Sequence, residues 1–228
     1  MGAEIREYAT ESFAQIDVVS LLDNKKVKDY FENNPITGLG RFIDVKHPGD
    51  IKKIVQSDLV FLLASRDINL AIVDELMLLP RKCVVVAFTP DQYCDELREA
   101  ATTYIVTKEN AKALHWYIKA LVENIALPSL VGLDFADVHH LFLTNRTMKV
   151  KKYKGKLDHP AALAKAIKND FKRLHDFLFL LHGSPQLTLD FLNDVAGTLC
   201  NAKYNGIWAA RIDENVRGLE LAFFAGGL

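Results

Sequence analysis

The chain has 228 residues, of which half are hydrophobic and a quarter are charged, and its formal net charge at pH 7 is −1. These values are ordinary for a globular protein and give no overall electrostatic attraction to nucleic acid or to a membrane surface. The spacing of the three cysteines fits neither a disulfide framework nor a metal site, and no His-x-x-x-His or Cys-x-x-Cys pair occurs. We therefore expect a reducing compartment and no bound metal.

The acidic N-terminal stretch lacks the apolar core of a signal peptide, and no apolar run is long enough to span a bilayer. We expect a cytoplasmic protein with no membrane partner. A chain of this length accommodates one large domain or two modest ones.

Short apolar runs in the first half indicate a parallel sheet. Residues 56–65 and 81–90 are bounded by polar residues and read as strands buried on both faces. Residues 16–22 and 102–107 are weaker strand candidates.

Two segments between and after these runs have helical periodicity, residues 68–79 and 111–125. Their expected apolar stripes are Leu70, Val73, Leu76 and Met77 in the first and Leu114, Ile118, Leu121 and Ile125 in the second. The alternation of strand and helix predicts an α/β layered fold.

The second half changes character. Its expected elements are helices over 136–145, 160–171 and 188–202, the last capped by Thr188, and strands over 175–184, 204–213 and 217–227. This order predicts a smaller α+β domain with a mixed sheet. The boundary is expected just after the long helix, which gives domains of residues 1–128 and 129–228.

A lysine-rich segment, Lys149 to Lys156, holds five lysines and one tyrosine. It reads either as a patch for nucleic acid or another anionic surface, or as an edge strand that lysines protect from pairing. We favour the edge strand, so a nucleic-acid partner is not expected.

Four stretches resemble the bacterial tubulin FtsZ. They are "LVGLDFADV" (130–138), "HGSPQLTLDFLNDVA" (182–196), "GIWAARIDENVRGLELAFFAGG" (206–227) and, more weakly, "TGLGRFIDVKHPGDIKKIVQSDLVFLLAS" (37–65). The first is similar to the synergy loop of that family, the second to its glycine-proline turn and acidic helix, the third to its closing strand pair, and the fourth to a phosphate loop, a helix and a strand. The resemblance implies a tubulin/FtsZ-like α/β fold: a reduced nucleotide-binding-type domain with a parallel sheet, a central helix and a smaller α+β domain.

The departures from this family concern its GTP site. The resemblance implies a GGGTGTG signature after the strand near residue 63, yet no glycine occurs between Gly49 and Gly132. Glycine lets backbone N–H groups approach a phosphate closely, so that phosphate cradle is missing. The first glycine loop of the family is missing as well. Gly38, Leu39 and Gly40 are all that is left of the third phosphate loop.

The base-reading pair of the family, Asn-Asp on the central helix, matches Ala111 and Lys112. A lysine cannot accept hydrogen bonds from guanine. We therefore expect that GTP, the ligand that the resemblance implies, is not bound and that the chain needs no cofactor. Trp116 and Tyr117 are expected either to fill the seam between the domains or to occupy the space that guanine would take.

Asp134 and Asp137 have two interpretations. A cap and an acidic first turn would stabilise the start of a helix. By resemblance, they are left from the loop that enters the pocket of a neighbouring subunit and polarises the attacking water there. An acidic loop beside a lost GTP site favours a protein that acts by association, as its own oligomer or as a subunit or modulator of an FtsZ-type filament, and that is not expected to be a GTPase.

A different class of function is also open from the sequence. The carboxyl ends of the parallel strands could form a crevice for a small ligand, in a binding protein or an unrecognised enzyme. Residues Ser65, Arg66, Asp67, Thr89 and Asp91 would then line it.

Overall fold

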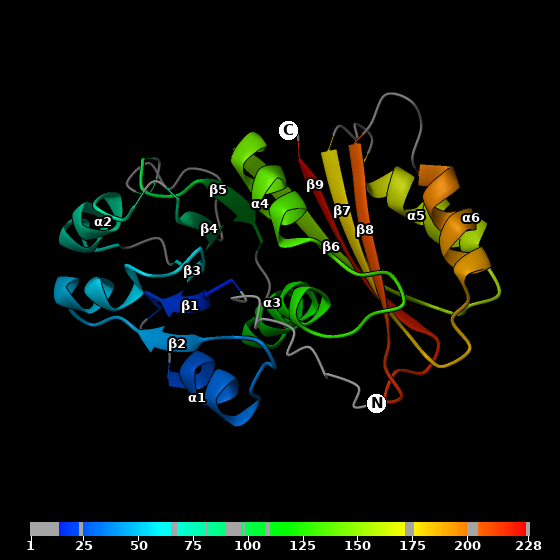
Figure 1. The fold of residues 1–228 in the computed structure, drawn as a ribbon, viewed down its shortest axis with the longest axis horizontal. Coiled ribbons are helices and arrows are strands. Elements are labelled where there is room, and N and C mark those ends of the chain that lie inside the picture. Colours follow the sequence, from blue (N-terminus) through cyan, green and yellow to red (C-terminus); the bar gives the residue numbers. More distant parts are fainter. Residues whose placement is uncertain are drawn as a thin grey trace, which may run out of the picture.

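The computed structural model describes residues 14–22, 25–64, 68–80, 82–89, 97, 99–107, 110–171, 176–199 and 205–226. One sheet in the strand order β2-β1-β3-β4-β5-β6-β9-β7-β8 runs through both halves of the molecule (Figure 1). The strands are β1 (Ile16–Ser20), β2 (Arg41–Asp44), β3 (Leu59–Leu63), β4 (Val84–Thr89), β5 (Thr103–Val106), β6 (Thr147–Gly155), β7 (Asp176–Gly183), β8 (Asn205–Ile212) and β9 (Leu219–Gly226). The helices are α1 (Lys25–Asn33), the 3-10 helix η1 (Pro48–Ile54), α2 (Leu70–Met77), α3 (Ala111–Ala126), α4 (Phe135–Thr144), α5 (Pro160–Asp170) and α6 (Leu189–Leu199).

The first half of the sheet is parallel and covered on both faces. Strands β2, β1, β3, β4 and β5 all pair in parallel. Every residue of β3 and β4 is buried, because α1, α3 and α4 pack on one face while η1 and α2 pack on the other. The continuous apolar runs therefore predicted the strand type correctly, and the α/β fold is confirmed.

Strand β6 joins the two halves, and here the edge-strand prediction is wrong. It pairs in parallel with β5 over Thr147 to Lys149 and antiparallel with β9 over Met148 to Gly155. The Thr103 hydroxyl supports this junction by donating to the carbonyl oxygens of Phe142 and Asn145. Pairing with β5 ends at Lys149, so the rest of this interior strand borders an opening where charged side chains reach water.

The second half is a mixed sheet between two helical layers, as expected. Strand β9 is antiparallel to β6 and β7, and β8 is parallel to β7. Helices α5 and α6 cover one face, and α3 packs against the other (Figure 1). The predicted cap is present, since the Thr188 hydroxyl oxygen accepts a hydrogen bond from the Phe191 amide at 3.2 Å.

Helix α3 is the central element. It begins after Asn110, whose side chain accepts from the Ala113 amide at 3.1 Å. The fully buried Tyr117 meets Phe224 of β9 edge to face, so the helix holds parts of both halves. The expected boundary between residues 128 and 129 falls in the connection from α3 to α4, and α4 packs back onto β4 of the first half.

Two expectations about the first half need correction. The inner face of α2 consists of Ile72, Val73 and Leu76, whereas Leu70 and Met77 are 61% and 48% exposed. Asn69 caps the helix, and Ile72, Val73 and Leu76 pack into the core between η1 and the sheet. Residues 37–65 contain the strand β2 and the 3-10 helix η1 before β3, and Pro48 sits at the start of η1, where its fixed φ suits a helix.

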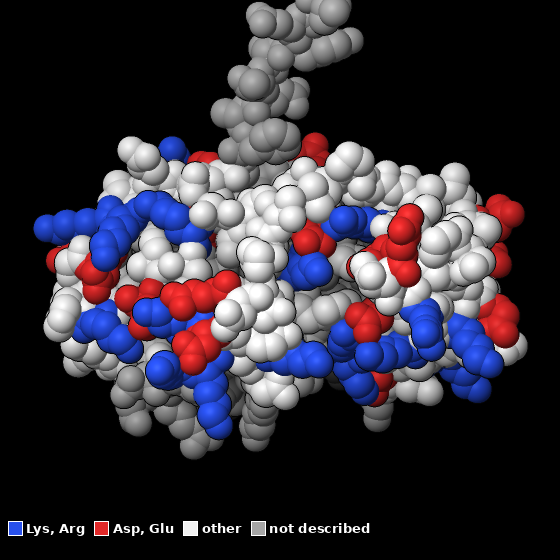
Figure 2. Space-filling view, turned by 90° about the horizontal axis from the view of Figure 1, so that it is seen from below, with Lys and Arg blue, Asp and Glu red and all other residues white. Residues whose placement is uncertain are grey.

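Charges of both signs are interspersed over the face shown in Figure 2. That pattern differs from the single-sign surface typical of nucleic-acid binding.

Among the described residues, no helix has the length and apolar character that crossing a membrane requires, and no group of three acidic, histidine or cysteine side chains is arranged to hold a metal.

Candidate functional site

The start of α4 carries the two predicted aspartates on the surface. The Asp134 carboxylate accepts a hydrogen bond from the Ala136 amide at 2.8 Å, and Asp137 lies in the first turn. Both are exposed. The cap interpretation is therefore confirmed, and it leaves both carboxylates turned toward solvent, where a partner could reach them.

The loop that leads to α4 is held in place by backbone bonds. Val131 and Ala210 of β8 exchange two N–H···O bonds of 3.0 Å each. The Leu133 side chain is buried, and its amide donates to the carbonyl of Asn124 near the end of α3. The acidic start of α4 is thus presented by a fixed loop at the last turns of α3.

Gly38 and Gly40 lie at the amino ends of the parallel strands. Gly38 has φ +89°, and a Cβ there would stand 2.3 Å from that of Ala126 at the end of α3. A Cβ on Gly40 would meet the side chains of Gln15 and Asp17. Close packing therefore explains both glycines without a ligand.

A buried, ion-paired carboxylate lies beside Gly40. The buried Asp17 accepts hydrogen bonds from Arg41 at 2.7 Å, Ser57 at 2.6 Å and Gln15 at 2.9 Å. Burial raises the pKa of Asp17, but these donors outweigh burial and hold that pKa below its usual value. The Asp17 carboxylate already occupies the side-chain donors of Arg41, Ser57 and Gln15, so binding of a phosphate at Gly38 to Gly40 stays a prediction that this geometry does not support.

The crevice is predicted at the opposite ends of the parallel strands, their carboxyl ends. Thr89 ends β4 there and is buried. The remaining crevice residues, Ser65, Arg66, Asp67 and Asp91, lie outside the described residues. The structure therefore separates Gly38 to Gly40 from Thr89, and the crevice stays a prediction.

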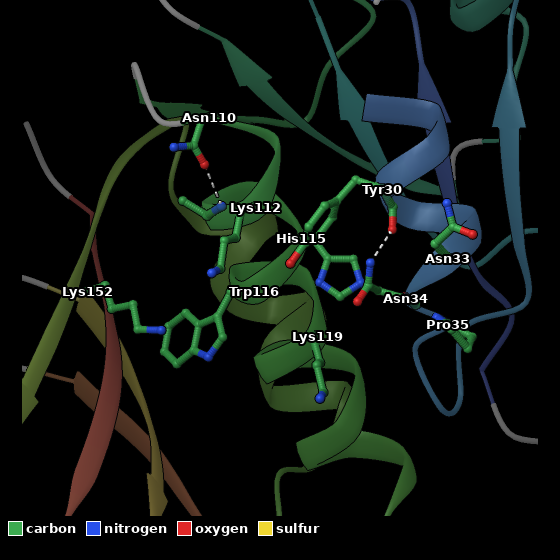
Figure 3. Close-up of a pocket in the computed structure, with 11 residues that line it drawn as sticks. Tyr30, Asn33, Asn34, Pro35, Asn110, Lys112, His115, Trp116, Lys119 and Lys152 are labelled. Atoms are coloured by element: carbon green, nitrogen blue, oxygen red, sulfur yellow. Dashed lines mark hydrogen bonds between the residues drawn. The ribbon is translucent and has the colours of Figure 1, made fainter. Parts of the chain in front are cut away.

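The space beside Lys112 is open. A cavity of about 540 Å³ lies over α3, between the end of α1 and the middle of β6 (Figure 3). We call it the α3 groove. It is lined by Tyr30, Asn33, Asn34, Pro35, Asn110, Lys112, Ala113, His115, Trp116, Lys119 and Lys152.

Contacts from both halves shape the α3 groove. His115 is buried under Tyr30 and Phe31, and its Nε2 donates to the Asn34 carbonyl at 2.6 Å. Burial lowers the pKa of His115 and so favours the neutral form of the ring. On the other side, the Lys152 ammonium of β6 lies 3.7 Å from the centre of the Trp116 ring. Trp116 and Tyr117 therefore do lie at the seam, but Trp116 lines an open cavity there.

The strand order, the central helix and the two helical layers define an FtsZ/tubulin-like fold. The sequence matches no protein-family model and no curated protein. Solved structures are similar throughout: an empty FtsZ dimer from M. jannaschii superposes with a TM-score of 0.73 at 16% identity, over 97% of this chain and 90% of that chain. A mutant FtsZ from the same organism gives 0.72 at 15% identity, over 94% and 91%. CetZ from Methanosaeta thermophila gives 0.60 at 12% identity, over 93% and 86%. The fold that the sequence resemblance implied is confirmed.

By resemblance, Lys112 is a lost base-reading position, and the sequence does not predict the α3 groove. Part of its lining could be predicted from helical spacing, because Lys112, Trp116 and Lys119 at i, i+4 and i+7 share one face of a helix. The approach of Lys152 could not be read in the same way, since it depends on how β6 enters the sheet.

Proposed function

We propose that this chain is an FtsZ-like cytoskeletal protein that acts by binding other subunits and does not turn over GTP. It works in the cytoplasm as its own oligomer or by docking on an FtsZ-type filament. The observation that carries the proposal is the acidic start of α4, which is exposed, capped and fixed by a strand-like bridge to β8. A preorganised loop of this kind binds a partner without the cost of ordering it.

The proposed loss of GTP turnover is supported by residue types and their positions. The segment between β3 and the loop before α4 has no glycine, and Lys112 stands at the start of α3, where the resemblance implies a base-reading carboxylate. Gly38 and Gly40 pack at the amino edge, against α3 and Asp17. The acidic loop can meet the GTP site of one neighbouring subunit, whereas this chain offers no GTP site to the loop of the next subunit. The chain would therefore bind at one end only and would cap or modulate a filament.

Co-sedimentation with GTP-bound FtsZ from the same source tests the association. We expect the chain to change the polymer mass or to pellet with it, and we expect Asp134→Ser and Asp137→Asn together to abolish the effect. Serine keeps the helix cap, so the pair removes charge and leaves the fold intact. Asp194→Asn, an exposed aspartate on α6, is the matched control.

Two results would oppose the proposal. One is an unchanged polymer mass with no wild-type chain in the pellet, combined with a monomer in solution at all concentrations. The other is an effect that the double variant retains in full.

A nucleotide test addresses GTP separately. We expect GTP with magnesium to raise the melting temperature no more than pyrophosphate does at the same concentration, and we expect no phosphate release. A stabilisation specific to guanine nucleotides would overturn the proposed loss of the GTP site while leaving the association test unaffected.

A further inference from the structure

The α3 groove has a marked local charge. Lys112 and Lys119 reach it from one face of α3 on either side of Trp116, and Lys152 reaches it from β6 (Figure 3). No aspartate or glutamate belongs to its described lining. Among the described residues that line the groove, the side chains that carry a charge at pH 7 are therefore the three lysines.

The carboxylates behind the groove do not neutralise it. Glu123 is shared by Arg211 at 2.5 Å and Lys119 at 3.9 Å. Glu220 is shared by Lys152 and Lys154, each at 2.8 Å. Two carboxylates are thus ion-paired with four cations, and Lys112 adds a fifth positive charge at the rim of the groove.

Lys152 is held where its charge is poorly solvated. Burial is the main reason that the pKa of Lys152 is lowered, and the nearby charges of Lys154 and Lys112 act in the same direction, although the hydrogen bond and charge of Glu220 oppose them. Its ammonium lies against the Trp116 ring, a contact that orients it toward the groove. An anion in the groove would relieve the repulsion between these lysines.

We propose that the α3 groove is a binding site for a small ligand that carries two or more phosphate charges, such as a pyrophosphate or a diphosphate ester. This inference goes beyond the proposed association function and uses different residues. Three ammonium groups around one cavity match the charge of a diphosphate better than that of a single carboxylate. The cavity volume of about 540 Å³ lies in the range of small-molecule sites.

The walls of the groove are fixed before a ligand arrives. Asn110 caps α3 and the His115–Asn34 bond ties α3 to the end of α1, so the lysines project from a rigid base. The first turn of α3 adds the positive end of its dipole next to Lys112. The groove is a bounded cavity of about 540 Å³, so a compact ligand fits it better than an extended polyanion does.

Fluorescence of Trp116 can test the proposal directly. The chain has two tryptophans, and Trp208 lies on β8 against Phe179, away from the groove. In a Trp208→Phe background, we expect pyrophosphate to change the emission of Trp116 in a saturable way. Lys112→Gln combined with Lys119→Gln should weaken this binding by about tenfold or more, since two charge-assisted contacts are lost. Lys165→Gln on α5 is the control and should bind like the parent.

Three results would overturn the proposal: no saturable response to pyrophosphate, equal binding by the double variant and the Lys165→Gln control, or tighter binding of a DNA duplex with an affinity that grows with its length. The last would indicate an extended surface. Circular dichroism of each variant confirms that it is folded, so a loss of binding can be assigned to the lysines. A GTP response that equals the pyrophosphate response supports the groove and leaves the proposed loss of a guanine-specific site in place.

Discussion

At the scale of single residues, Asp134 combines a structural role with an exposed charge. Its carboxylate caps α4 at 2.8 Å and also faces solvent. We predict that Asp134→Ala lowers the free energy of unfolding by about 1 kcal/mol, whereas Asp134→Ser changes it little, because serine is as good a cap. Urea denaturation of the two variants measures the difference. Equal stabilities would show that the cap contributes nothing here.

A second residue-scale prediction concerns acid stability. Burial lowers the pKa of His182 to about 4. The Nε2 atom of its ring accepts a hydrogen bond from the side-chain Nδ2 of Asn124 at 3.0 Å. The unfolded chain binds this proton near pH 6.5, and the folded chain does so only near pH 4. Stability from the neutral ring is therefore complete above pH 6.5 and lost as the pH falls toward 4, by about 3 kcal/mol.

Urea denaturation at several pH values checks this slope. His182→Gln should flatten it, and the part that persists is assigned to other groups such as His115, whose pKa burial also lowers. A variant that is as acid-sensitive as the wild type would contradict the assignment.

The residue scale is also where the sequence predicted least about the site. The cap at Asp134 was readable from its position before an apolar helix. Among the cations of the α3 groove, Lys152 was not readable, because its contact with Trp116 depends on where the pairing of β6 with β9 places that strand. Contacts between side chains distant in the chain carry no local periodicity.

At the scale of elements, Gly38 lies in the loop that follows α1 and packs against the last turn of α3. We predict that Gly38→Ala lowers the free energy of unfolding by about 2 kcal/mol or more, because alanine is strained at φ +89° and its Cβ would collide with Ala126. Gly49→Ala is the matched control, since a Cβ there meets nothing within 4 Å. Thermal unfolding of the two variants tests the prediction, and similar losses would contradict it.

The elements themselves were largely predictable where their pattern was strong. The buried runs at β3 and β4 and the stripe of α3 left little choice, because only strands buried on both faces or an amphipathic helix suit them. The lysine-rich β6 was misplaced at an edge, since its lysines indicate solvent on one side but not whether a neighbour pairs with the other. The buried face of α2 was misassigned, because this helix has apolar residues on more than one side and the pattern alone does not show which side meets the sheet.

At the scale of the whole molecule, the sheet and α3 connect the halves that the sequence divided at residue 128. Strand β6 pairs with β5 on one side and β9 on the other, α4 packs on β4, and the Glu123–Arg211 ion pair ties α3 to β8. Apolar side chains of both halves belong to one core around α3. These links favour a single cooperative unit over two independent domains.

The two tryptophans can decide between one unit and two. Trp116 lies on α3 at the seam, where it contacts Lys152, and Trp208 lies within the second half, so Trp208→Phe and Trp116→Phe give one reporter each. We predict that each transition, followed by fluorescence in urea, coincides with the loss of circular dichroism of the same variant.

Thr103→Val at the β5–β6 junction, which loses a buried donor to two carbonyls, should lower the free energy of unfolding seen by both reporters by the same amount, about 1 to 3 kcal/mol. A shift confined to Trp116, or two separate midpoints within one variant, would show that the halves unfold independently and that β6 transmits no stability between them.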